Sequence, residues 1–287
     1  MKKNKLIAIA FIAFGLANLT TSCTKDDKEP ADSAAIIATA EDLAQAACIN
    51  EDILNQLKGY IAIAEKGGLP ALKAMLENGP ASGIIITMDK PDWVTFPKTI
   101  TIDFGTQGFV GPGGNKMTGK LMIFVSNKMD VPNSFCRLTF ENFAVNAVKV
   151  VGTNTLTFKG VTSTFHPYWT FNAQNTMTRL DGKTVVLNSD LTREILDMNG
   201  TPTNLLDDMY SIKGSANGTN ALGKSYTMVI AENNPLIMDG AWLYFTKGSI
   251  TLTSESQTAV IDFGNGAKDN KATVTTNGKT KEITLKI

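Results

Sequence analysis

The sequence predicts a mainly β protein, with an N-terminal helical segment followed by antiparallel β-sheet units. Up to about residue 80, apolar residues recur at helical spacing. From residue 84 onward, short β-branched and aromatic runs alternate with turn signals, among them six Asn-Gly or Asp-Gly pairs. These pairs favour the left-handed dihedrals of tight hairpins. We expect two β-units, each a sandwich or a strongly curled sheet.

The composition is typical of a globular chain and shows no excess of basic residues that would favour nucleic-acid binding. Of 287 residues, 43% are hydrophobic and 19% are charged, with 27 basic and 27 acidic residues. Removal of residues 1–22, which hold three lysines and no acidic residue, leaves a net charge of −3. We therefore expect no nucleic-acid partner.

The first residues read as a secretory signal peptide. Lys2, Lys3 and Lys5 precede the apolar run Leu6–Leu19, which has signal-peptide length and is too short for a spanning helix. We expect residues 1–22 to be removed and the polar residues 23–33 to form a tether.

Residues 34–80 form the predicted helical segment. Ser33 is a suitable N-cap, and the run from Ala34 to Ala47 is rich in helix formers. A second helix is expected after Asn50. Gly67-Gly68 should break the pattern before a short third helix.

Thirteen runs after residue 84 have the composition of strands. They are Ile84–Thr87, Thr99–Phe104, Lys120–Val125, Arg137–Phe140, Val148–Val151, Thr155–Phe158, Thr184–Leu187, Ser225–Ile230, Ala241–Phe245, Ser249–Thr253, Ala259–Phe263, Ala272–Thr275 and Glu282–Ile287. Helical spacing returns only at Asp190–Met198 and in a short turn near Asn204–Met209.

An internal repeat supports two β-units. Residues 102–105 read Ile-Asp-Phe-Gly, and the same four residues recur at 261–264. Each copy closes a β-run and leads into a glycine-rich turn. We place the two units at 81–185 and 186–287.

One segment matches a nucleotide-binding pattern. Gly218–Ser225 fits G-x-x-x-x-G-K-[ST], but the phosphate-binding loop requires a helix after it. Tyr226–Ile230 instead has the pattern of a strand. We interpret the segment as a turn between strands and expect no nucleotide partner.

No catalytic or metal-binding constellation emerges, and we expect neither an enzyme nor a cofactor. His166 is the only histidine, no G-x-S-x-G motif is present, and Asp103 and Asp262 are expected to point outward or cap their turns. Cys48 and Cys136 remain open between a disulfide and two buried thiols.

Residues 165–171 form an aromatic strand with two different faces. Phe165, Pro167, Trp169 and Phe171 share one face, while His166, Tyr168 and Thr170 share the other. Either the strand is core with a polar outer face, or His166, Tyr168 and Trp169 form a ligand-binding platform for a glycan.

The segment Leu19-Thr20-Thr21-Ser22-Cys23 resembles a bacterial lipobox, and the Cys-x-Lys-acidic-acidic run of Cys23, Lys25, Asp26 and Asp27 resembles the surface-export signal of Bacteroidota-type lipoproteins. The strand-and-turn stretches at 96–105, 119–121, 140–143, 151–153, 261–266, 269–274 and 277–279 resemble a family of uncharacterised Bacteroidota-type lipoproteins. The resemblance implies diacylglycerol and palmitate on Cys23 and an outer-membrane location facing the cell exterior. The family offers no activity that could be carried over to this chain.

The leading expectation is thus a non-catalytic surface lipoprotein that binds an extracellular ligand, with a glycan as the best guess. Two alternatives stay open. One is a structural or anchor subunit of a surface assembly that pairs a protein partner with an exposed edge strand. The other is a carrier whose curled sheet encloses an apolar ligand.

Overall fold

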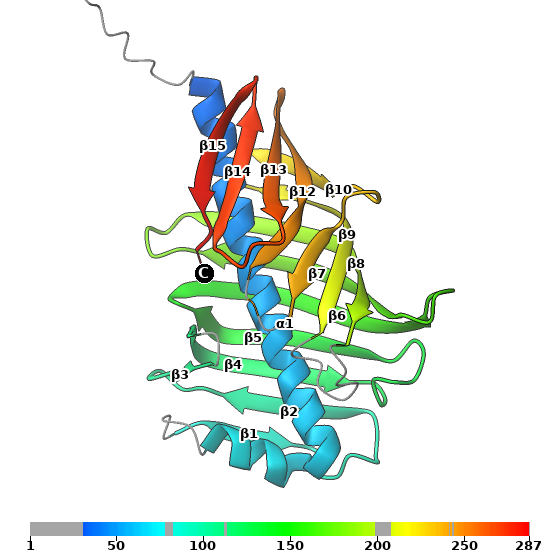
Figure 1. The fold of residues 1–287 in the computed structure, drawn as a ribbon. Helices are drawn as coiled ribbons and strands as arrows, with labels where there is room; N and C mark the ends of the chain where they lie inside the picture. The colour runs from blue at the N-terminus through cyan, green and yellow to red at the C-terminus, as the bar shows by residue number, and fades with distance from the viewer. Residues whose placement is uncertain are drawn as a thin grey trace, which may run out of the picture.

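The computed structural model describes residues 31–77, 83–111, 114–198, 208–240, 242 and 244–286. The described chain is mainly β, as predicted, with one N-terminal helix and one large antiparallel sheet (Figure 1). Helix α1 spans Ala31–Glu77 and is kinked at Gly67 and Gly68, where the predicted break lies.

The strands are β1 (Ile85–Met88), β2 (Lys98–Asp103), β3 (Phe109–Val110), β4 (Lys116–Val125), β5 (Phe135–Val145), β6 (Val148–Val161), β7 (Pro167–Thr178), β8 (Thr184–Asp197), β9 (Met209–Thr219), β10 (Ser225–Ile230), β11 (Leu236–Asp239), β12 (Phe245–Ser254), β13 (Gln257–Asn265), β14 (Lys271–Thr276) and β15 (Lys279–Thr284).

The sheet is an antiparallel meander in which neighbours in sequence are neighbours in space. Strand β3 pairs with β4 alone. β10 and β11 both lie between β9 and β12 and run in the same direction, so they form two segments of one interrupted strand. Within the described residues, β1 and β15 are the two end strands of the main path, and the two-residue strand β3 is paired on one side only.

Helix α1 lies on the concave face of this curved sheet and contacts strands from β1 at one edge to β14 near the other (Figure 1). No side chain between Asp42 and Ile61 is exposed. Apolar residues of the helix and the inward-facing residues of the strands form one hydrophobic cluster. The helix therefore takes the place that a second sheet would have in a sandwich.

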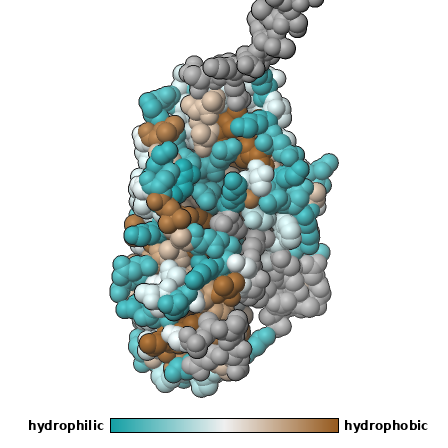
Figure 2. Space-filling model, turned by 90° about the vertical axis from the view of Figure 1, so that its left-hand side faces the viewer, coloured by the Kyte–Doolittle hydropathy of each residue, from teal (hydrophilic) through white to brown (hydrophobic). Residues whose placement is uncertain are grey.

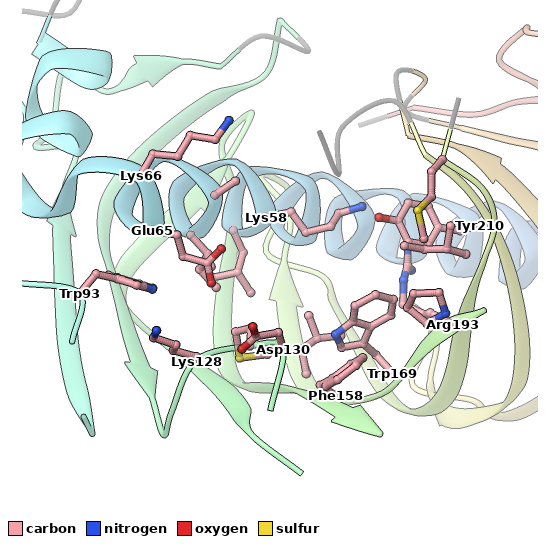
Figure 3. A pocket seen from close by; sticks show the side chains of 18 residues that line it. Lys58, Glu65, Lys66, Trp93, Lys128, Asp130, Phe158, Trp169, Arg193 and Tyr210 are labelled. Carbon is pink, nitrogen blue, oxygen red and sulfur yellow. The ribbon is translucent and has the colours of Figure 1, made fainter. Parts of the chain in front are cut away.

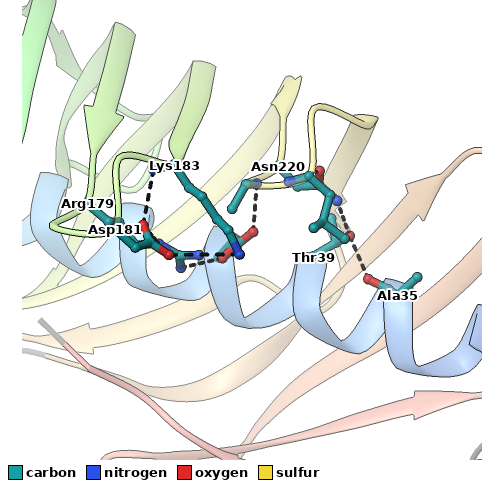
Figure 4. Close-up of polar contacts among 9 residues, drawn as sticks. Ala35, Thr39, Arg179, Asp181, Lys183 and Asn220 are labelled. Atoms are coloured by element: carbon teal, nitrogen blue, oxygen red, sulfur yellow. Dashed lines mark hydrogen bonds and ion pairs between the residues drawn. The ribbon is translucent and has the colours of Figure 1, made fainter.

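Polar side chains fix the helix within this apolar surrounding. Arg179 Nη1 donates to Asp42 Oδ1 at 2.6 Å, and the backbone N–H of Ala221 donates to Asp42 Oδ2 at 2.9 Å. Asn220 Nδ2 donates to Thr39 Oγ1 at 2.7 Å (Figure 4). A buried polar group without a partner is costly. The helix is therefore held in the position and rotation that keep these contacts with the turns after β7 and β9.

A second polar link joins the middle of α1 to β6 and β7. Asn175 Nδ2 donates to Asn50 Oδ1 at 2.8 Å and to Asn154 Oδ1 at 2.7 Å. Gly152, opposite Asn175 in the register, has φ of +135°, and a Cβ there would lie 1.9 Å from the carbonyl oxygen of Gln174. Only glycine fits this position, where β6 crowds against β7.

Strand residues alternate between buried and exposed positions, as in β10 and β14. Figure 2 shows a face on which hydrophilic side chains predominate and hydrophobic ones form small, separate groups. Val151, Val229 and Val260 are apolar residues at exposed positions of their strands. Scattered apolar residues of this kind are ordinary on a protein surface.

Several predicted elements are confirmed and others need correction. The hairpin turn at Asn277-Gly278 has positive φ at both residues, as a type I′ turn requires. By contrast, the predicted 185/186 boundary falls inside β8, and residues on both sides belong to one sheet. The two repeated Ile-Asp-Phe-Gly segments therefore end strands β2 and β13 of the same sheet.

The helical predictions also need correction. α1 runs without a break through Asn50 and begins at Ala31, inside the predicted tether, so Ser33 lies within the helix instead of capping it. Of the predicted helical stretch Asp190–Met198, all but Met198 belongs to β8, because pairing with β7 and β9 overrides its helical spacing. The predicted turn at Asn204–Met209 lies outside the described residues up to 207, and Met209 begins β9. The predicted signal peptide also lies outside the described residues.

Candidate ligand-binding cavity

A cavity of about 580 Å³ lies between α1 and the concave face of β6 to β9. Helix α1 contributes one wall, with Leu57, Ile61 and Ala62 among its residues. Trp93 and the β4–β5 connection close one end (Figure 3). Volumes of about 300–1,000 Å³ are typical of small-molecule sites.

The opposite wall follows from strand periodicity. Leu156 and Phe158 on β6, Pro167 and Trp169 on β7, and Arg193 and Ile195 on β8 all line the cavity. Each pair is two residues apart, and such residues point to the same face of a strand. The rings of Phe158 and Trp169 lie 5.3 Å apart between centroids at an angle of 46°. The wall is thus largely apolar and aromatic.

One end of the cavity is basic. Arg193 Nη1 donates to both oxygens of Glu51 on α1, at 2.5 and 2.6 Å, and both side chains are almost fully buried. Lys58 Nζ lies 4.0 Å from the centroid of the Tyr210 ring. Burial, and then the charge of Arg193, lower the pKa of Lys58 to about 7, while Glu51 and Asp208 act in the opposite direction.

The other end carries charges of both signs. The side chains there are Trp93 and the exposed Glu65, Lys66, Lys128 and Asp130 (Figure 3). Partial burial and the nearby Asp130 charge raise the pKa of Glu65, whereas Lys128 lowers it. The cavity is therefore largely apolar, with the buried Lys58 at one end and a balanced set of exposed charges at the other.

The residues of the predicted glycan platform do not form one surface. Trp169 faces the cavity, on the side of the strand predicted to point inward. His166 Nδ1 lies 3.0 Å from Glu194 Oε1, and Tyr168 pairs with Glu194 in the register, so both belong to the outward side. Phe165, predicted to face inward, has positive φ in the preceding turn and is 81% exposed.

The other sequence-predicted features have structural roles. Asp103 Oδ1 accepts a hydrogen bond from the N–H of Gly105, and Asp262 Oδ1 accepts one from Gly264, so both aspartates cap their turns. Residues 220–224 of the nucleotide-binding pattern form the β9–β10 turn, followed by a strand. Cys48 and Cys136 are free, buried thiols, which decides between the two alternatives.

Cys23, Lys25, Asp26 and Asp27 lie outside the described residues. In the part of the chain that the structure describes, no cluster of three or more His, Cys, Asp or Glu side chains is arranged to hold a metal ion. Over the same residues, no helix combines the length and the apolar composition that crossing a membrane needs.

Sequence reasoning missed Lys58, Glu51 and Arg193. A signal for Lys58 was present, because this lysine stands between Leu57 and Tyr60, two residues of the apolar helical repeat. A charge placed among core residues indicates either a buried partner or a site. The partner of Glu51 was not visible, because Arg193 lies 142 residues away in the sequence.

The buried Glu51–Arg193 pair should behave differently from an exposed one. We expect Glu51→Leu to lower the free energy of unfolding by about 3–5 kcal/mol, because it leaves buried Arg193 unpaired. The double variant Glu51→Leu/Arg193→Met should recover most of that loss in urea denaturation. Lys224→Met, which removes the exposed pair with Glu255, should change stability by under about 1 kcal/mol. A double variant as unstable as Glu51→Leu would contradict the pairing.

Lys58 should make stability depend on pH. Its pKa is about 7 in the folded chain and about 10.4 when unfolded, so the unfolded state binds more protons between these values. The free energy of unfolding contributed by Lys58 therefore rises with pH across that window. Urea denaturation at several pH values should show wild type gaining on Lys58→Met between about pH 7 and pH 10. Parallel pH profiles would disprove the shift.

In comparisons with known proteins, no family model, no curated protein and no solved structure matches this chain.

Proposed function

We propose that the protein is a non-catalytic, lipid-anchored surface protein that holds a small apolar ligand in the cavity between α1 and β6–β9. The observation that carries this proposal is the cavity itself, about 580 Å³ with walls that are mostly aliphatic and aromatic. A concave apolar site with a few polar groups is the usual form of a small-molecule pocket.

The glycan alternative has less support. Sugar recognition uses an accessible flat ring together with nearby hydrogen-bonding groups. Trp169 lines the cavity, whereas His166 and Tyr168 lie on the other side of the same strand. The ring and the polar donors therefore do not converge on one sugar.

The assembly alternative also has less support. A partner strand would add to β1 or β15. β1 has only four residues, and β15 exposes Lys279, Lys281 and Glu282. Short length and exposed charge are the features by which edge strands avoid pairing with other chains.

The anchoring part of the proposal rests on the sequence of residues 1–27. Cys23 is expected to carry the acyl chains, because it follows the apolar run and the small residues of the lipobox-like segment. Several acyl chains on one cysteine give stable membrane attachment. The polar segment that follows Cys23 would join the anchor to α1.

Acylation predicts a direct labelling result. Cells that express the protein and are fed radiolabelled palmitate should incorporate label into wild type and into the control Cys48→Ala, but not into Cys23→Ala. Replacement of Lys25, Asp26 and Asp27 by alanine should keep the label and remove accessibility to protease added to intact cells. Equal labelling of Cys23→Ala and wild type would refute the anchor.

Ligand binding can be tested with a neutral apolar dye, N-phenyl-1-naphthylamine, on a chain that begins at residue 24. This chain retains every described contact, since the described residues begin at 31. We expect saturable fluorescence enhancement with one site.

Ala62→Trp should reduce dye affinity at least about tenfold, because Ala62 lines the cavity and the indole would fill it. Ala34→Trp, the same change at an exposed position of α1 outside the lining, should bind the dye like wild type. Circular dichroism would confirm that both variants fold. Undiminished binding by a folded Ala62→Trp variant would mean that the dye site is elsewhere.

A further inference from the structure

Lys58 is a buried cation without a hydrogen-bonding partner. Only 8% of the surface of Lys58 is accessible to solvent. No described residue accepts a hydrogen bond from its Nζ. In Figure 3 the side chain extends from α1 along the cavity toward Tyr210. An ammonium group has three donors, and leaving them unsatisfied in the interior is costly. The site therefore lacks an acceptor.

The neighbouring acids do not supply that acceptor. Both oxygens of Glu51 accept from Arg193, and Asp208 Oδ2 accepts from the Tyr210 hydroxyl at 3.3 Å. Burial and the Arg193 charge outweigh Glu51 and Asp208 in their effect on the pKa of Lys58. An acceptor beside Nζ would therefore supply hydrogen bonds that the neighbouring side chains do not.

The buried end of the cavity sets the orientation of a ligand. The far end holds two acidic and two basic side chains, all of them exposed: Glu65, Asp130, Lys66 and Lys128. That end therefore carries no net charge, and solvent screens its charges. Phe158 and Trp169 lie between Lys58 and the far end and offer mostly apolar surface to a chain (Figure 3). A negatively charged head group would therefore lie at Lys58, with its hydrocarbon chain along Phe158 and Trp169.

We propose that the ligand is a fatty carboxylate, bound with its carboxylate against Lys58 Nζ and its hydrocarbon chain along Phe158 and Trp169. This inference rests on the proposed binding function and specifies the class of ligand. A carboxylate matches the buried ammonium of Lys58 in charge and accepts its hydrogen bonds. No covalent step is involved.

Three ligands of equal chain length separate the head from the chain: laurate, dodecanol and dodecyltrimethylammonium. The affinity of each is measured by its displacement of N-phenyl-1-naphthylamine from the chain that begins at residue 24. The assay buffer has a pH about one unit below the pKa of Lys58, so that the ammonium is protonated. Laurate should bind about 10–100-fold more tightly than dodecanol, because hydrogen bonds to a charged group are the stronger kind. Dodecyltrimethylammonium should bind most weakly.

Lys58→Met should bring the affinity for laurate down to that for dodecanol and leave dodecanol unchanged. Lys66→Met is the matched control, since Lys66 also lines the cavity from α1 but is exposed. It should leave both affinities within about twofold, as expected of a solvent-screened charge. Equal affinity of wild type for laurate and dodecanol would overturn the carboxylate proposal and leave the apolar site standing. Failure of all three ligands and of the dye would overturn the proposed function as well.

Fluorescence quenching tests the orientation without changing Lys58. Trp93 lies at the end that holds Glu65 and Lys66, and Trp169 lies nearer Arg193 (Figure 3). Laurate brominated on its terminal carbon should quench Trp93 in the Trp169→Phe variant. Laurate brominated beside the carboxylate should quench Trp169 more strongly in the Trp93→Phe variant. The reverse pattern would overturn the proposed orientation.

Discussion

The structure depends on one constraint: the middle of a long helix is buried on all sides, and the polar groups of that stretch have to be accommodated inside. Between Asp42 and Ile61 the helix has no exposed side chain. Asp42, Asn50 and Glu51 each meet this demand through a specific partner on β7, β8 or a neighbouring turn. The sheet therefore has to curve around α1 with a defined register, and these partners set it.

The cavity arises where this enclosure is incomplete. Along most of α1 the inward-facing strand residues pack against the helix, but from Leu57 to Lys66 they leave open space between the helix and β6–β8. Lys58 lies at this transition and lacks the partner that Glu51 and Asp42 have. A polar group without its expected hydrogen-bond partner often marks a functional site. Here the unpartnered Nζ of Lys58 belongs to a residue that lines the cavity.

Local features of this fold were predictable from sequence, and the long-range ones were not. Strand alternation and the turn chemistry of Asn277-Gly278 depend on neighbouring residues, so they identified the hairpins and the inward direction of Trp169. One continuous sheet around a helix, instead of two units, depends on pairings between residues that are distant in sequence. The same holds for Lys58 and Glu51, whose environment is supplied by β8 and β9.

The position of α1 at the start of the chain has a consequence for folding. Its polar contacts reach across 125, 137, 142 and 181 residues of sequence, to Asn175, Arg179, Arg193 and Asn220. Contacts between residues so far apart in the sequence form slowly, because the entropy lost on closing long loops opposes them. An emerging chain would hold its most apolar helix uncovered until the late strands are made. For the surface location that we propose, passage across the cell envelope would then favour a chaperone that shields this helix in transit.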